Sequence, residues 1–144
     1  MTDSMNVKKN ILLYAWQLPQ NLLGALMFWW YRRNSKIFKG TFRDIRVLYS
    51  DRMRGGLSLG EYVILPFSAG WLPECSWLKD VDNLHRHEWG HSWQSRLLGW
   101  LYLPFVGFQS LAHAFLHGPC CGDKDYHHFW TERWADRLGG VERD

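Results

Sequence analysis

The pentapeptide His87-Glu88-Trp89-Gly90-His91 constrains this 144-residue chain more than any other feature. Positions four apart lie on one face of an α-helix, so a helix here would point both imidazoles at one metal ion. Glu88 would then lie beside a zinc-bound water, whose pKa falls from about 15.7 to about 7. These are the groups needed to hydrolyse a peptide bond at neutral pH. The alternative without a metal is a helix with two hydrogen-bonded histidines and a solvent-facing glutamate.

The surrounding residues favour a helix over residues 82–98. Residues 80–83 include N-cap types, and Gly99 is a typical helix terminator. Gly90 costs an isolated helix about 1 kcal/mol relative to Ala, so it indicates that another backbone or a substrate passes close by. A bulky stripe on the same helix is expected to pack into the core: His85, Trp89 and Trp93.

A second pair of acidic residues lies downstream at helical spacing. Glu132 follows His91 by 41 residues and precedes Asp136 by four, so a helix over residues 126–138 would place both carboxylates on one face. Two histidines and a glutamate are a common ligand set for catalytic zinc. We predict that Glu132 is the third ligand and that Asp136 accepts a hydrogen bond from His87 or His91. The alternative is a charged, solvated helix face.

Together, His-Glu-Trp-Gly-His and Glu132-Arg-Trp-Ala-Asp136 resemble the HExxH…ExxAD pattern of gluzincin metallopeptidases, in the style of the CaaX-prenyl-endopeptidase clan and the minimal gluzincins. The resemblance implies zinc bound by His87, His91 and Glu132, with Glu88 as general base and Asp136 supporting a ligand histidine. The order of elements extends the resemblance over roughly residues 40–140. The chain lacks the membrane helices and long inserts of the larger members, and no transition-state Tyr, His or Arg is transferred.

His128 is predicted to donate a hydrogen bond to the oxyanion that develops during water attack. It lies four residues before Glu132, so on a continuous helix it shares the stripe of Glu132 and Asp136. The alternatives are that it only packs near the metal, or that the helix begins later. Other residues stay open for this role: Tyr126, His127, His113 and His117.

Composition indicates a single domain with many aromatic residues. Ten Trp, six Tyr and eight Phe make 17% of the chain, and much of this must lie in the core. Residues 1–60 carry ten Lys and Arg against three Asp and Glu, a net charge of +7. Residues 61–144 carry seven against eleven, a net charge of −4. The basic half suits an anionic membrane surface or simple solvation, and no nucleic-acid motif accompanies it, so no nucleic-acid partner is expected.

The three cysteines, Cys75, Cys120 and Cys121, do not form the even set of a disulfide framework. This odd number indicates a reducing compartment. We therefore expect a cytoplasmic location, with membrane association left open, and ordinary thiols in a loop over residues 118–124.

Two uncharged stretches, residues 11–31 and 97–117, raise the question of membrane contact. As helices, both are long enough to cross a hydrocarbon layer of about 30 Å. Polar residues and prolines interrupt them, including Gln17, Pro19 and Pro104. A buried or interfacial helix over residues 10–31 is therefore favoured over a span, and residues 100–117 are expected to form an apolar or broken helix.

β-structure is expected as a hairpin over residues 41–66, followed by an irregular segment over 67–80. The predicted fold is one α+β domain, a small antiparallel sheet packed on the two metal-binding helices. An edge strand beside the metal helix, 57–65 or 42–49, is expected to receive substrate by β-augmentation.

The sequence thus predicts zinc-dependent hydrolysis of a peptide or protein substrate. The alternative is a non-catalytic, zinc-stabilised module that binds a partner or a membrane. Glu88 favours the enzyme, because a structural zinc site usually has four protein ligands and needs no base. The sequence indicates neither the cleavage preference nor the oligomeric state.

Overall fold

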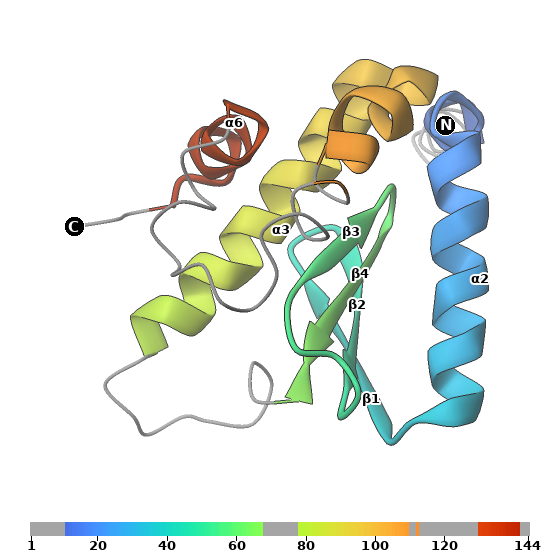
Figure 1. Ribbon diagram of the computed structural model, residues 1–144, viewed down its shortest axis with the longest axis vertical. Coiled ribbons are helices and arrows are strands. Elements are labelled where there is room, and N and C mark those ends of the chain that lie inside the picture. Colours follow the sequence, from blue (N-terminus) through green and yellow to red (C-terminus); the bar gives the residue numbers. More distant parts are fainter. Residues whose placement is uncertain (1–10, 68–77, 110–111, 113–129, 142–144) are drawn as a thin grey trace, which may run out of the picture.

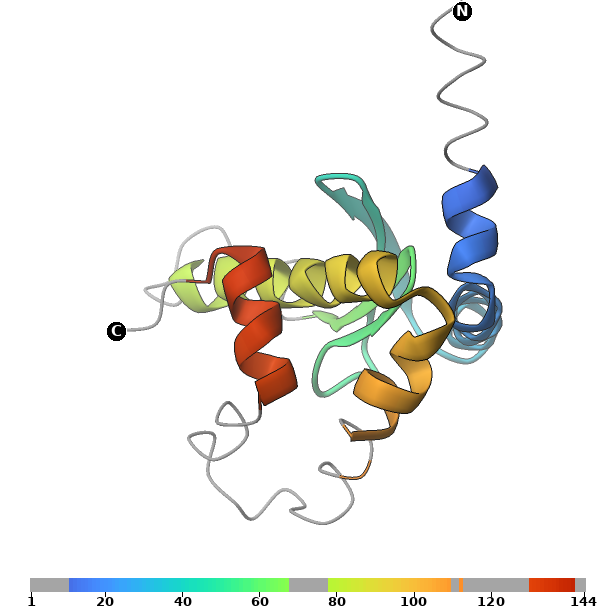
Figure 2. The same ribbon diagram turned by 90° about the horizontal axis from the view of Figure 1, so that it is seen from above.

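A central sheet separates two helical layers. Helix α2 (Leu18–Asn34) covers one face of the sheet and α3 (Leu78–Leu98) lies on the other, with α6 (Trp130–Gly139) packed across α3 (Figures 1 and 2). The predicted α+β class is confirmed. The computed structural model describes residues 11–67, 78–109, 112 and 130–141.

The four-stranded sheet is mixed, with strand order β1-β2-β4-β3. β1 (Ile37–Phe42) and β2 (Ile45–Ser50) are antiparallel, as are β3 (Leu57–Leu59) and β4 (Tyr62–Pro66). β2 and β4 are parallel, so the prediction of a purely antiparallel sheet is wrong at this central pairing. The predicted hairpin also began too late, since most of β1 precedes residue 41.

The predicted continuous strand over residues 57–65 is wrong as well. The chain turns at Gly60, whose φ of 63° lies in the left-handed region that favours glycine. The returning strand β4 contains the apolar run Val63 to Leu65, which is at most 1% exposed. A run buried on both faces suits a central strand, so β4 lies between β2 and β3.

The main core lies between the sheet and the first half of α3. Alternate residues of β2 and β4 point into it and are at most 7% exposed. Leu84 and Trp89 of α3 pack on this cluster, whereas Trp93 is 37% exposed, so its predicted burial is wrong. The buried members of the cluster are Ile45, Val47, Tyr49, Val63 and Leu65.

Helix α3 carries the pentapeptide and begins earlier than predicted. It starts at Leu78, so Asp82 lies inside the helix, where it pairs with Arg86 at 2.6 Å. An i, i+4 ion pair of this kind supports the first turns of a helix. Gly99 follows the last helical residue with a φ of 54°, as expected for a terminator.

The two apolar stretches are helical where they are described. Residues 11–16 form a helix that breaks at Gln17 before α2, which runs to Asn34 rather than to residue 31. A 3₁₀ turn (η2, Gly99–Leu101) and a π-helical turn (η3, Leu103–Gly107) form the broken helix expected after α3. Among the described residues, none of the helices combines the length and apolar character needed to cross a bilayer.

Candidate metal centre

Two glycines allow the backbones of α3 and α6 to cross closely. A Cβ at Gly90 would overlap the carbonyl oxygen of Ala135, and a Cβ at Gly139 would overlap that of Arg86. The close approach expected at Gly90 is therefore that of the α6 backbone. This crossing brings the face of α6 that carries Glu132 against the pentapeptide.

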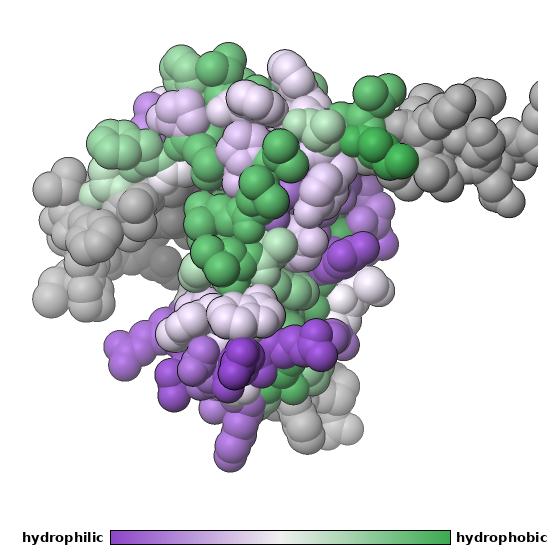
Figure 3. All heavy atoms as spheres, turned by 90° about the vertical axis from the view of Figure 1, so that its right-hand side faces the viewer, coloured by the Kyte–Doolittle hydropathy of each residue, from purple (hydrophilic) through white to green (hydrophobic). Residues whose placement is uncertain are grey.

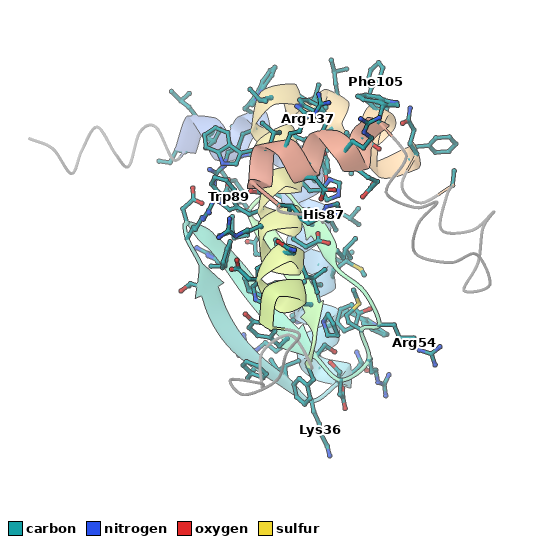
Figure 4. The ribbon with its side chains drawn as sticks, turned by 90° about the vertical axis from the view of Figure 1, so that its left-hand side faces the viewer. Lys36, Arg54, His87, Trp89, Phe105 and Arg137 are labelled. Carbon is teal, nitrogen blue, oxygen red and sulfur yellow. The ribbon has the colours of Figure 1, made fainter. Side chains whose placement is uncertain are left out.

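Three side chains converge between the two helices (Figure 4, where His87 lies beneath α6). The Nε2 atoms of His87 and His91 lie 3.1 Å apart, and Oε2 of Glu132 lies 3.0 Å and 3.3 Å from them. A tetrahedral metal with ligand bonds of about 2.05 Å separates its ligand atoms by about 3.3 Å, so this spacing fits one ion. The three residues are at most 7% exposed.

Hydrogen bonds fix the orientation of both imidazoles. Nδ1 of His87 donates to Oδ1 of Asp136 at 2.6 Å, and Nδ1 of His91 donates to Oε1 of Gln94 at 2.8 Å. These contacts leave the Nε2 atom of each ring facing Glu132, and each ring could bind a metal through this atom in its neutral form. The sequence predicted that Asp136 accepts a hydrogen bond from His87 or His91, and in the structure the donor is His87.

Gln94 also belongs to the candidate site, and it was not predicted from the sequence. Its Nε2 donates to the backbone carbonyl of Thr131 at 2.7 Å, which orients the amide so that Oε1 faces His91. The residue is fully buried and ties the metal helix to α6 beside Glu132. Its spacing of three residues from His91 was the only available signal, and many helix residues share it.

The electrostatics of the group favour a cation. Burial alone would lower the pKa of His87, but its hydrogen bonds to Asp136 and Glu132 raise it to about 10. Burial would raise the pKa of Glu132, but hydrogen bonds from His87 and His91 hold it well below its usual range. Three carboxylates, those of Glu88, Glu132 and Asp136, lie near the two imidazoles in a largely buried site. A divalent cation would balance this excess of negative charge.

Glu88 lies against the connection that leads into β3. It is 4% exposed, and a Cβ on Gly56 would overlap its carboxylate. Burial raises the pKa of Glu88, although the nearby His91 and His87 act in the opposite direction. A raised pKa brings a carboxylate closer to the range in which it accepts and returns a proton at neutral pH.

Replacing Gly56 by Ala is expected to displace the Glu88 carboxylate while leaving the metal ligands in place. If Glu88 acts as a base, a displacement of about 1 Å should lower kcat by roughly 10²-fold without reducing metal content. Gly55→Ala is the matched control, because its Cβ would meet no atom within 4 Å. Equal kcat values for the two variants would contradict a positioning role for Gly56.

The strands expected to receive substrate differ in their accessibility. Residues 45–49 lie in β2, which is paired on both sides, so they cannot accept another strand. β3 forms an edge of the sheet beside α3, but the hydroxyl of Tyr102 already donates to the carbonyl of Ser58 at 3.1 Å. Addition of a peptide strand to β3 therefore stays a prediction, restricted to backbone groups other than this carbonyl.

Several predicted features lie outside the described residues. They include His128, all three cysteines and the loop over 118–124. They also include the other candidates for the oxyanion role: Tyr126, His127, His113 and His117.

A hollow of about 440 Å³ lies against α6, but none of the three ligands lines it. It is therefore not part of the metal centre. Its lining residues are Trp130, Arg133, Trp134 and Arg137.

Comparison with known proteins finds no relative of this chain. No protein-family model, curated protein or solved structure matches the chain. The geometry therefore stands alone: among the described residues, His87, His91 and Glu132 form a buried group that can hold a metal ion.

Proposed function

We propose that this chain is a zinc-dependent peptidase of the gluzincin type. The observation that carries the proposal is the convergence of His87, His91 and Glu132 with the buried carboxylate of Glu88 beside them. Two nitrogen ligands and one oxygen ligand from protein are a common set for catalytic zinc, which keeps a fourth position open.

The donor set supports zinc over calcium and magnesium. Calcium and magnesium prefer six or more oxygen ligands, whereas two imidazoles and one carboxylate at tetrahedral spacing suit zinc. The hydrogen bonds from His87 to Asp136 and from His91 to Gln94 are the outer contacts that typically accompany such ligands.

In this proposal each side chain has a separate task. A bound zinc ion would supply Lewis acidity toward the attacking water and the substrate carbonyl. Glu88 takes the proton from the water and returns it to the leaving amine, while Asp136 and Gln94 keep the ligand rings aligned. For the developing oxyanion, His128 is the candidate donor from the sequence.

Metal removal and restoration test the proposal directly. The purified protein should contain one zinc ion per chain by elemental analysis and should cleave members of a peptide library. A chelator should abolish cleavage and added zinc should restore it, because the metal would supply the Lewis acidity. Stoichiometric zinc with no cleavage of any peptide would instead support the non-catalytic module, and lack of zinc would reject both.

A further inference from the structure

The first turns of helix α2 present polar side chains to the protein, whereas the outward side of the helix is largely apolar. Gln20 and Asn21 are fully buried against the sheet and α3, together with Gln17 just before the helix. A helix on the surface of a water-soluble protein shows the reverse pattern. The outward residues are 41–59% exposed and form the α2 stripe: Leu22, Leu23, Leu26, Trp29 and Trp30.

Specific hydrogen bonds hold the polar side inward. Nε2 of Gln20 donates to Oγ of Ser95 at 2.9 Å and to the carbonyl of Gly99 at 2.8 Å. Oδ1 of Asn21 accepts from the backbone N–H of Glu61 at 2.9 Å. Rotating α2 to bury its leucines would break these bonds inside the protein, so the outward stripe is a fixed feature of the fold.

A second apolar surface adjoins the N-terminal end of the α2 stripe. The indole of Trp16 donates to the carbonyl of Arg96, and that of Trp100 donates to the carbonyl of Ala15, so residues 11–16 and η2 lie side by side. We call this second surface the helical end. Its outward residues are 50–69% exposed: Leu97, Trp100, Leu101, Phe105 and Phe108.

Positive charge gathers at the opposite end of the molecule. Arg32 and Arg33 follow Trp29 and Trp30 by one turn of α2 and are exposed, as is Lys36. Figure 3 shows hydrophobic residues over the upper and middle parts of this face and hydrophilic ones below, and Figure 4 shows Phe105 and Lys36 at opposite ends. The order along the molecule is therefore apolar, aromatic and then basic.

We propose that the α2 stripe and the helical end bind the surface of a lipid bilayer that contains anionic lipids. In this arrangement the leucine and phenylalanine side chains enter the acyl region, Trp29 and Trp30 lie at the headgroup level, and Arg32 and Arg33 contact lipid phosphates. Polar groups turned inward and apolar groups turned outward are what a lipid environment selects.

The charge distribution favours lipid over a protein partner. A protein partner would need an apolar surface of matching shape and an acidic region placed at one end of it. An anionic bilayer supplies both chemistries over any area, and the indole and guanidinium groups of Trp29 and Arg33, 5.1 Å apart, suit its interface. This inference does not depend on peptidase activity.

Vesicle flotation with the full chain tests the proposal. Wild-type protein should float with vesicles of phosphatidylcholine and phosphatidylglycerol, and at least ten-fold less protein should float with phosphatidylcholine alone. Raising the salt concentration should weaken binding to the anionic vesicles, because it screens the attraction of the basic end. Wild-type protein that stays out of both vesicle fractions would overturn the proposal.

Paired variants separate the two contributions. Arg32→Gln with Arg33→Gln should weaken binding to anionic vesicles by about 30-fold, since each basic residue near such a surface contributes about 1 kcal/mol. Leu26→Ser with Trp29→Ser should weaken it at least ten-fold even at high salt. These side chains face outward, so the far-UV circular dichroism spectrum should be unchanged.

Matched controls come from α6, on another side of the molecule. Arg133→Gln with Arg137→Gln removes the same charge, and Trp130→Ser removes a tryptophan that is 53% exposed. Both controls should float as the wild type does. An equal loss in the controls would show non-specific adhesion and overturn the proposal. Dimers that Leu26→Ser with Trp29→Ser disrupts, without flotation of the wild type, would assign the face to a second copy of the chain.

Discussion

A Glu88→Gln protein is expected to retain zinc and to lose peptide hydrolysis, with kcat reduced by at least about 10²-fold. The amide has nearly the same shape as the carboxylate but cannot accept the proton of the attacking water. Zinc content should be unchanged, because Glu88 is not one of the three converging ligands. The measurement is cleavage of a fluorogenic peptide by the zinc-loaded protein, alongside elemental analysis of the same sample.

Asp82→Asn is the matched control for this substitution. It changes another carboxylate of α3 to an amide, but Asp82 is exposed and pairs with Arg86 rather than with the metal group. Its kcat should equal that of the wild type. Full activity of the Glu88→Gln protein would reject Glu88 as the base, and loss of zinc from it would indicate a structural role for Glu88 at the site.

The double variant His87→Ala with His91→Ala should lose stoichiometric zinc altogether, because one carboxylate remains of the three ligands. The double variant should also be less stable than the wild type, because metal that binds only the folded chain adds its binding energy to folding. Chelation of the wild type should cause the same loss of stability. With free zinc at 100 times its Kd, binding contributes about 2.7 kcal/mol, or about 10 °C in Tm.

His85→Ala is the control for removing a histidine from the same helix. The His85 ring accepts or donates at 2.7 Å with the hydroxyl of Tyr49 and is not part of the metal group. This variant should lose stability but keep one zinc per chain. If the double variant binds zinc as the wild type does, the ion must occupy a different site.

The part of the candidate site that could be predicted from sequence depends on local spacing. His87 and His91 are one helical turn apart, as are Glu132 and Asp136, so each pair shares a face once its helix forms. Gly90 was unfavourable for an isolated helix and therefore indicated a close neighbour, which is the carbonyl group of Ala135. Such inferences need only helix geometry and the cost of an unusual residue.

Features that depend on distant segments could not be predicted in the same way. In the structure, the turn at Gly60 reverses the chain, and the buried run Val63 to Leu65 then pairs in parallel with β2. Neither the turn nor the apolar run shows from sequence alone which strand will be the neighbour. Gln94 likewise gained its role only when Thr131 came within 2.7 Å of its amide.

The N-terminal helix shows a different limit of sequence reasoning. Gln17 and Gln20 interrupt an uncharged stretch, and on that basis they argued against a membrane span. In the structure the same residues form the inward side of the helix and leave the leucines outside. Composition cannot reveal this, because it does not record which side of a helix faces the protein.

The inward side of α2 also has a calorimetric consequence. Exposure of apolar surface raises the heat capacity on unfolding by about 0.45 cal/K/mol per Å², whereas exposure of polar surface lowers it by about 0.26. Separating α2 from α3 would expose the amides and hydroxyl of Gln17, Gln20 and Ser95 at this contact. The contact should therefore keep nearly the same strength on cooling, while the apolar core between the sheet and α3 weakens.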